Sequence, residues 1–147
     1  MNFAEMVFHQ MSEERFKRDM ERIMNSTNII STPETDKRFG VEGNFWLYSV
    51  GMKDNYNLPD IEMRGVPGML MRAAMHSMNE INAYRLSSEK PILVGQTIGW
   101  SCGDIRVHQG DDWDGRYQWK AEDMLRLMSR DTDVTDCACC ANKHIEE

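Results

Sequence analysis

The chain has 147 residues, a formal net charge of −7, 41% hydrophobic residues and 28% charged residues. This length fits one domain with its own hydrophobic core, and this composition excludes a disordered or fibrous protein. The acidic balance argues against nucleic acid as a partner, because phosphate binding requires clustered lysine and arginine residues. We expect one domain over residues 1–130 and a polar, cysteine-containing tail over residues 131–147.

The first residues, Met1 to Glu5, lack the basic and apolar regions of a secretion signal, and no apolar run reaches the length of a membrane span. We therefore expect a cytoplasmic protein without a membrane partner. In a reducing compartment its four cysteines would be thiols or metal ligands rather than disulfides. Thirteen methionines suit either an irregular core or an adaptable binding surface.

The first predicted element is a helix over residues 13–24, with Ser12 as its N-cap and apolar residues at helical spacing. Residues 25–43 are rich in Ser, Thr and Asn and predict an irregular connection, with a short strand at Ile29 and Ile30 as one option. Phe45 to Val50 is apolar on both alternating faces, which predicts a buried, central strand.

The segment from Asp60 to Arg64 alternates strictly and predicts a half-exposed strand, with Ile61 and Met63 directed inward and the charges outward. A proline at a tolerated first-turn position opens the next predicted helix, which spans residues 67–84. Ile105 and Val107 are the inward residues of a later alternating strand. The remaining predicted elements are strands at residues 92–94, 97–100 and 104–108 and a closing helix at residues 120–128.

Helices mixed with hairpin-like loops, rather than regular strand–helix alternation, favour an α+β fold. We expect a largely antiparallel or mixed sheet with the helices packed mainly on one face. A doubly wound parallel sheet is the alternative.

Three short segments carry a resemblance to a known family: Tyr48-Ser49-Val50-Gly51-Met52, Leu58-Pro59-Asp60 and Gly65-Val66-Pro67. Their order and spacing resemble the bacterial and phage family called domain of unknown function 4262. A later aromatic segment, residues 113–119, is similar to one near the end of such domains. The chain departs from the family pattern at Leu58, Asp60 and Gln118. The resemblance implies a small cytosolic α+β domain of prokaryotic or phage origin and no particular activity.

Several motifs have simpler interpretations than catalysis. Residues 99–103 match the G-x-S-x-G nucleophile elbow, but a strand pattern follows where the elbow requires a helix, so a β-turn is favoured. Asp111, Asp112 and Asp114 resemble a calcium loop, yet the position of the required Glu holds Ala121. A histidine and a glutamate at residues 76 and 80 suit an exposed i,i+4 pair on a helix.

The spacing of cysteine and histidine residues near the end of the chain suggests a zinc site. Cys137 and Cys140 form a C-x-x-C pair, and His144 lies about one helical turn further on. Together with Cys102 they supply three thiolates and one imidazole, although Cys139 competes as a ligand. The alternative is a frayed tail of ordinary thiols.

A ligand surface is predicted where the outward charges of the alternating strands, Asp60 to Arg64 and Asp104 to His108, share one sheet face. Nearby aromatic residues offer stacking planes for a nucleotide-like ring, and an arginine can bind phosphate or carboxylate. The predicted ligand-binding residues are Glu62, Arg64, Trp100, Asp104, Arg106, His108, Trp113, Arg116, Tyr117 and Trp119. The alternative is a solvated outer sheet face with the aromatic residues in the core.

No catalytic constellation passes the test of its structural context. The leading hypothesis is a small, non-enzymatic binding protein that sequesters a small polar ligand or docks on a host protein. The alternative is a hydrolase that uses Glu62 or His108 as a general base, or a zinc bound by Cys and His. A third hypothesis is a structural homo-oligomer without a ligand.

Overall fold

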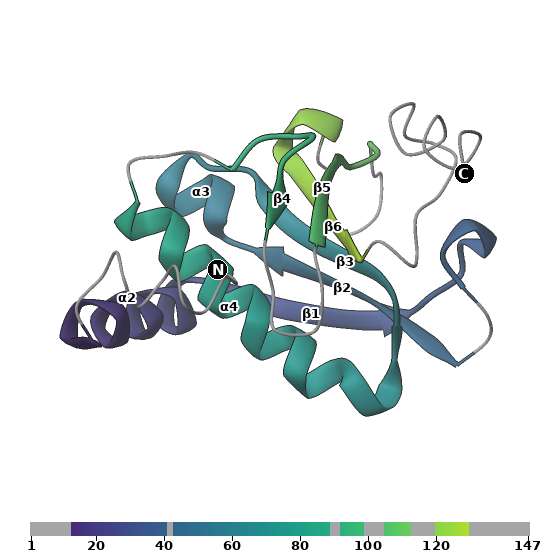
Figure 1. Cartoon of the computed structure of the whole chain (residues 1–147), viewed down its shortest axis with the longest axis horizontal. Helices are drawn as coiled ribbons and strands as arrows, with labels where there is room; N and C mark the ends of the chain where they lie inside the picture. The colour runs from purple at the N-terminus through teal and green to yellow at the C-terminus, as the bar shows by residue number, and fades with distance from the viewer. Residues whose placement is uncertain (1–12, 41–42, 89–91, 99–104, 113–119, 130–147) are drawn as a thin grey trace.

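The computed structural model describes residues 13–40, 43–88, 92–98, 105–112 and 120–129. Six strands form one sheet in the order β1-β2-β3-β6-β5-β4 (Figure 1). Only the β3–β6 pair is parallel; the other four pairs are antiparallel. The strands are β1 (Asn28–Pro33), β2 (Asn44–Val50), β3 (Asp60–Pro67), β4 (Thr97–Ile98), β5 (Ile105–Gln109) and β6 (Met124–Ser129).

Helix α4 (Met71–Ser87) lies across one face of the sheet, and α2 (Glu13–Ser26) packs against α4 (Figure 1). A short helix, α3 (Met52–Tyr56), fills the connection from β2 to β3. Three 3₁₀ turns complete the described elements: η1 (Lys37–Phe39), η2 (Gly68–Leu70) and η3 (Ala121–Asp123). This arrangement confirms the predicted α+β fold.

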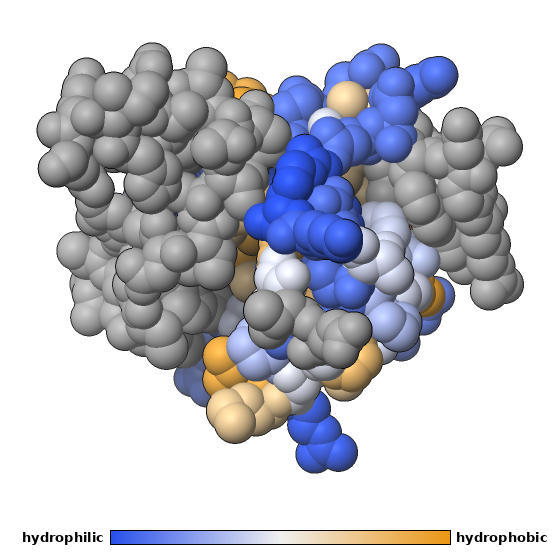
Figure 2. Space-filling view, turned by 90° about the vertical axis from the view of Figure 1, so that its right-hand side faces the viewer, coloured by the Kyte–Doolittle hydropathy of each residue, from blue (hydrophilic) through white to orange (hydrophobic). Residues whose placement is uncertain are grey.

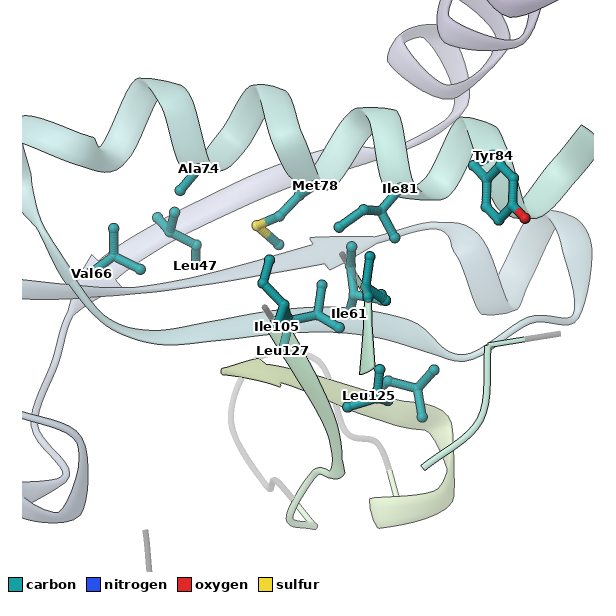
Figure 3. Close-up of a cluster of buried hydrophobic side chains, with 12 residues drawn as sticks. Leu47, Ile61, Val66, Ala74, Met78, Ile81, Tyr84, Ile105, Leu125 and Leu127 are labelled. Atoms are coloured by element: carbon teal, nitrogen blue, oxygen red, sulfur yellow. The ribbon is translucent and has the colours of Figure 1, made fainter. Parts of the chain in front are cut away.

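The core lies between α4 and the sheet (Figure 3). Met78 and Ile81 of α4 point toward Leu47 of β2, Ile61 of β3 and Leu127 of β6, and all five side chains are at most 1% exposed. The predicted inward residues of the alternating strands also belong here: Ile61, Ile105 and Val107 are core members, and Met63 packs against them. Alternation therefore predicted correctly which side of each strand meets the core.

The methionines serve mainly the core among the described residues. Met52, Met78, Met124 and Met128 are each at most 3% exposed, which fits the use of Met as an adaptable filler. Met69, at 90% exposure, is the clearest exception.

Two predicted elements are wrong. The predicted helix at residues 120–128 is instead η3 followed by strand β6, which is held between β3 and β5. Ile92 to Val94, predicted as a strand, is irregular and leads into a turn at Val94 and Gly95, outside the sheet. The helix predicted from Pro67 starts later, because β3 extends to Pro67 and η2 intervenes before α4.

Asp60 is buried rather than outward and solvated as expected, at 9% exposure. Its carboxylate accepts hydrogen bonds from the Ser49 hydroxyl at 2.8 Å and from the backbone N–H groups of Met52 at 3.0 Å and Lys53 at 3.3 Å. Gly51, at φ +115°, turns the chain from β2 into α3. The segments 48–52 and 58–60 therefore meet at this joint.

Candidate functional site

The face of the sheet opposite α4 carries a row of ionisable side chains across three strands. Glu62 of β3 is in register with Arg126 of β6, which is in register with His108 of β5. These three residues are 1%, 0% and 3% exposed. Glu62 and His108 thus lie on the same face of the sheet, but their strands are not neighbours. The residue between them, Arg126, comes from a segment predicted to be helical.

Glu62 is held by donors from three strands. Its Oε1 accepts hydrogen bonds from Trp46 Nε1 at 2.9 Å and Arg64 Nη1 at 3.3 Å, and its Oε2 lies 3.5 Å from Arg126 Nε. Burial raises the pKa of Glu62 above its ordinary value, against the opposing charges of Arg126 and Arg64. Because Oε1 accepts two hydrogen bonds and Oε2 is ion-paired with the guanidinium group of Arg126, Glu62 is poorly placed to act as a general base toward a substrate.

Arg64 forms a two-pronged ion pair with Glu34. Its Nε and Nη2 lie 3.0 Å and 2.6 Å from the two carboxylate oxygens, and the N–H of Gly65 donates to Oε1 of the same carboxylate at 2.8 Å. Burial alone would raise the pKa of Glu34, but the hydrogen bonds and charge of Arg64 outweigh it and hold that pKa below its usual value. This pair ties the end of β1 to the middle of β3.

Asp111 forms ion pairs with two arginines. Its Oδ2 lies 2.8 Å from Arg126 Nη2 and 2.8 Å from Arg38 Nη2, and Arg38 also pairs with Asp36 at 2.8 Å. The two arginines hold the pKa of Asp111 below its usual range although partial burial opposes this. We call the connected set the outer network: Glu34, Asp36, Arg38, Glu62, Arg64, Asp111 and Arg126.

The ring of Phe39 holds the three arginines of the outer network together. The guanidinium carbons of Arg38, Arg64 and Arg126 lie 4.7, 4.6 and 4.6 Å from the ring centre. Arg64 also lies 4.3 Å from the centre of the Trp46 ring. Aromatic faces attract cations, so these rings offset part of the repulsion between neighbouring guanidinium groups.

An open hollow of about 240 Å³ lies beside the outer network. Its lining residues are Thr35, Asp36, Trp46, Glu62, Arg64, Asp111 and Asp112. The segment between β1 and β2 that contributes Thr35 and Asp36 lies on the right in Figure 1, and the described surface on that side is mainly hydrophilic (Figure 2). The hollow therefore combines four carboxylates, one guanidinium group, a hydroxyl group and an indole ring.

Of the predicted ligand-binding residues, the structure brings Glu62 and Arg64 to the hollow and buries His108 nearby. Arg106 is half-buried on β5, and its Nη1 lies 3.4 Å from the carbonyl oxygen of Gly95 rather than at the hollow. The other predicted ligand-binding residues lie outside the described part of the chain: Trp100, Asp104, Trp113, Arg116, Tyr117 and Trp119. The same holds for the G-x-S-x-G serine and for the predicted zinc ligands Cys102, Cys137, Cys140 and His144.

Sequence reasoning missed Glu34, Phe39, Trp46 and Arg126, and considered Asp111 only as part of a calcium loop. A signal existed for Trp46, because it alternates with the core residue Leu47 and so faces away from α4. Arg126 likewise stands between the core residues Leu125 and Leu127. Neither pattern predicts which charged residues, distant in the sequence, contact Trp46 and Arg126 in the fold.

His76 and Glu80 on α4 form the i,i+4 pair that the sequence favours. His76 Nε2 lies 2.6 Å from Glu80 Oε1, and the His76 side chain is 67% exposed, as in an ordinary i,i+4 pair. Among the described residues, no cluster of three or more His, Cys, Asp and Glu side chains has the geometry of a metal site.

Comparisons with protein-family models, curated proteins and solved structures gave no match. In the ranges that the structure describes, every helix is too short or too polar to cross a bilayer.

Proposed function

We propose that the protein is a non-enzymatic binding protein that holds a small polar ligand in the hollow beside Trp46. The observation that carries this proposal is the outer network, whose buried ion pairs make one wall of the hollow. Glu62 and Arg64, with side chains 2% and 9% exposed, are fixed by several partners each. A wall that is already ordered loses little conformational freedom when a ligand arrives, which favours binding.

Binding is better supported than hydrolysis at this site. A general base must reach a proton of the substrate, whereas Glu62 has both oxygens against protein donors. The carboxylates nearer the surface, Asp36 and Asp111, are paired with arginines. The groups of the hollow are thus suited to hydrogen bonding and charge recognition.

The lining restricts the chemistry of the ligand. Asp36, Asp111 and Asp112 present carboxylate oxygens, and Thr35 presents a hydroxyl group, so a ligand with N–H or O–H donors is favoured. Trp46 offers an aromatic surface for a ring such as a nucleobase. The volume of about 240 Å³ lies below the range of pockets for drug-sized ligands, which favours a small metabolite.

Mass spectrometry of small molecules retained through native purification tests this proposal. Asp112→Asn and Asp36→Asn each remove one charge from the lining while keeping the side-chain oxygen that caps Ala121 or Arg38. We expect the wild-type protein to retain a metabolite and each variant to retain at least tenfold less. Glu21→Gln, on the exposed side of α2, makes the same charge change as a control and should retain the wild-type amount.

Retention of the same metabolite by all four proteins would show that the metabolite binds outside the hollow. No retained molecule from any lysate, together with stable capture of a host protein, would replace the small-ligand proposal with docking on a partner.

A further inference from the structure

A second polar cluster lies on the other side of the sheet, within the last two turns of α4. The five residues from Ile81 to Arg85 are all at most 7% exposed, so this part of the helix is enclosed on every side. Two of the five are polar: Asn82 at 0% exposure and Arg85 at 7%. Buried polar groups normally have hydrogen-bond partners, so their partners can be counted one by one.

Arg85 fixes the orientation of the Asn82 amide. Arg85 Nη1 donates to Asn82 Oδ1 at 3.0 Å. The opposite amide orientation would place two donors against each other, so Nδ2 must be the atom that points away from Arg85. Among the described residues, this fully buried Nδ2 has no hydrogen-bond acceptor.

Arg85 has one described hydrogen-bond acceptor, Asn82 Oδ1, and one neighbouring carboxylate, that of Asp60. Asp60 is close enough for its charge to favour the guanidinium form of Arg85, but burial dominates and lowers the pKa of Arg85 to about 10. The oxygens of Asp60 are engaged by Ser49, Met52 and Lys53. The pair thus presents several N–H donors in a low-dielectric site and few described acceptors.

We propose that Asn82 and Arg85 form a binding site for a small oxyanion, such as inorganic phosphate or the carboxylate group of a metabolite. An oxyanion has several acceptor oxygens and can take one hydrogen bond from Asn82 Nδ2 and others from the guanidinium group. Arg85 is 7% exposed and Asn82 is 0% exposed, so an ion would have to reach the pair from the side of Arg85. This site is separate from the hollow, because α4 and the hollow lie on opposite faces of the sheet.

Two substitutions at Asn82 distinguish an oxyanion-binding site from a buried amide that simply lacks a hydrogen-bond partner. Asn82→Asp replaces the donor Nδ2 with an acceptor oxygen and places a carboxylate beside Arg85. The new carboxylate therefore takes the place of the bound ion. Asn82→Leu keeps a similar volume and removes both polar atoms. Asn79→Asp, half-buried on the same helix, makes the same charge change away from the pair and serves as the control.

The measurement is calorimetric titration of the full chain with sodium phosphate, with sodium chloride at equal ionic strength as the reference. We expect phosphate binding by the wild-type protein and by Asn79→Asp, and at least tenfold weaker binding by Asn82→Asp and Asn82→Leu. Sodium formate should compete with phosphate if a carboxylate group can occupy the site.

Equal phosphate affinity in the wild-type protein and both Asn82 variants would overturn the proposal, because the ion would then bind elsewhere. Absence of phosphate and formate binding by the wild-type protein would also overturn it, and would leave Asn82 Nδ2 to an internal water molecule.

Discussion

Arg126 is the residue on which the outer network converges. Its side chain is 0% exposed and contacts Glu62 on one side and Asp111 on the other, with the ring of Phe39 4.6 Å from its guanidinium carbon. Removing a guanidinium group from water has a large cost, which only well-placed carboxylates and other acceptors offset. The stability of this region should therefore depend on keeping both members of each pair.

Arg126→Met tests that dependence. Loss of the guanidinium group leaves Glu62 buried with fewer compensating donors, and we expect the free energy of unfolding to fall by about 3 kcal/mol. Urea denaturation measures the change. The double variant Glu62→Leu with Arg126→Met should lose less than the sum of the two single losses, and strict additivity would show that the pair is not coupled.

Glu34 should make the stability of the protein depend on acid pH. Its pKa is 4.5 in the unfolded chain and lower in the folded protein, because Arg64 binds the charged form. Its contribution is therefore present above pH 4.5 and is lost as the pH falls through the folded pKa. We expect Glu34→Gln to destabilise the protein by about 2 kcal/mol at pH 7 and by much less at pH 3. An equal loss at both pH values in urea denaturation would contradict this.

At the scale of elements, β3 is shaped by an irregularity opposite Trp46. Phe45 pairs with Val66 and Leu47 with Met63, so two residues of β3, Arg64 and Gly65, face one residue of β2. Gly65 has φ +61°, and a Cβ atom there would overlap the carbonyl oxygen of Phe39. The bulge brings Arg64 to Glu34 and lets the η1 segment approach the strand.

Gly65→Ala should disrupt this arrangement. The substitution adds a backbone clash to the strain of a positive φ, and we expect a loss of at least roughly 3 kcal/mol in the free energy of unfolding. Gly95→Ala is the matched control, because Gly95 has φ +94° but an added Cβ atom would have no described neighbour within 4 Å. That control should cost only about 1 kcal/mol. Similar losses in both variants would mean that the approach of Phe39 is unimportant.

The error at β6 shows where sequence patterns stop being informative. Lys120 to Met128, which contains several good helix formers, is predicted to be a helix. In the fold, the alternation of Leu125, Arg126 and Leu127 prevails, because β3 and β5 supply hydrogen-bonding partners on both sides. Elements with strong local patterns, such as α2, were predictable, whereas a strand that depends on partners from two other segments of the chain was not.

The candidate site was also predictable only in part. Alternation alone placed Glu62 and Arg64 on the face away from the core. It could not show that they would be buried, because their burial depends on Glu34 and Arg126 arriving from β1 and β6. For a charged residue in a strand, the sequence pattern predicts which face of the sheet it lies on. Whether it is buried there, and by which partners, depends on the fold.

At the scale of the whole molecule, the sheet consists of two antiparallel halves joined by one parallel seam. The halves are β1-β2-β3 and β6-β5-β4, and three register pairs between β3 and β6 join them. Both halves contribute residues to the larger core cluster, between α4 and the sheet. A shared core predicts that the halves unfold together, although each is a meander of its own.

Leu125→Ala, at the seam opposite Ile61, tests this cooperativity. Leu125 is 5% exposed, and we expect its truncation to lower the free energy of unfolding by about 3 kcal/mol. Hydrogen exchange in low denaturant should report the same loss in peptides from β2 and from β5, because opening one half removes the core of the other. Loss of protection confined to β5 and β6, with β2 unchanged, would mean that the seam separates two independent folding units.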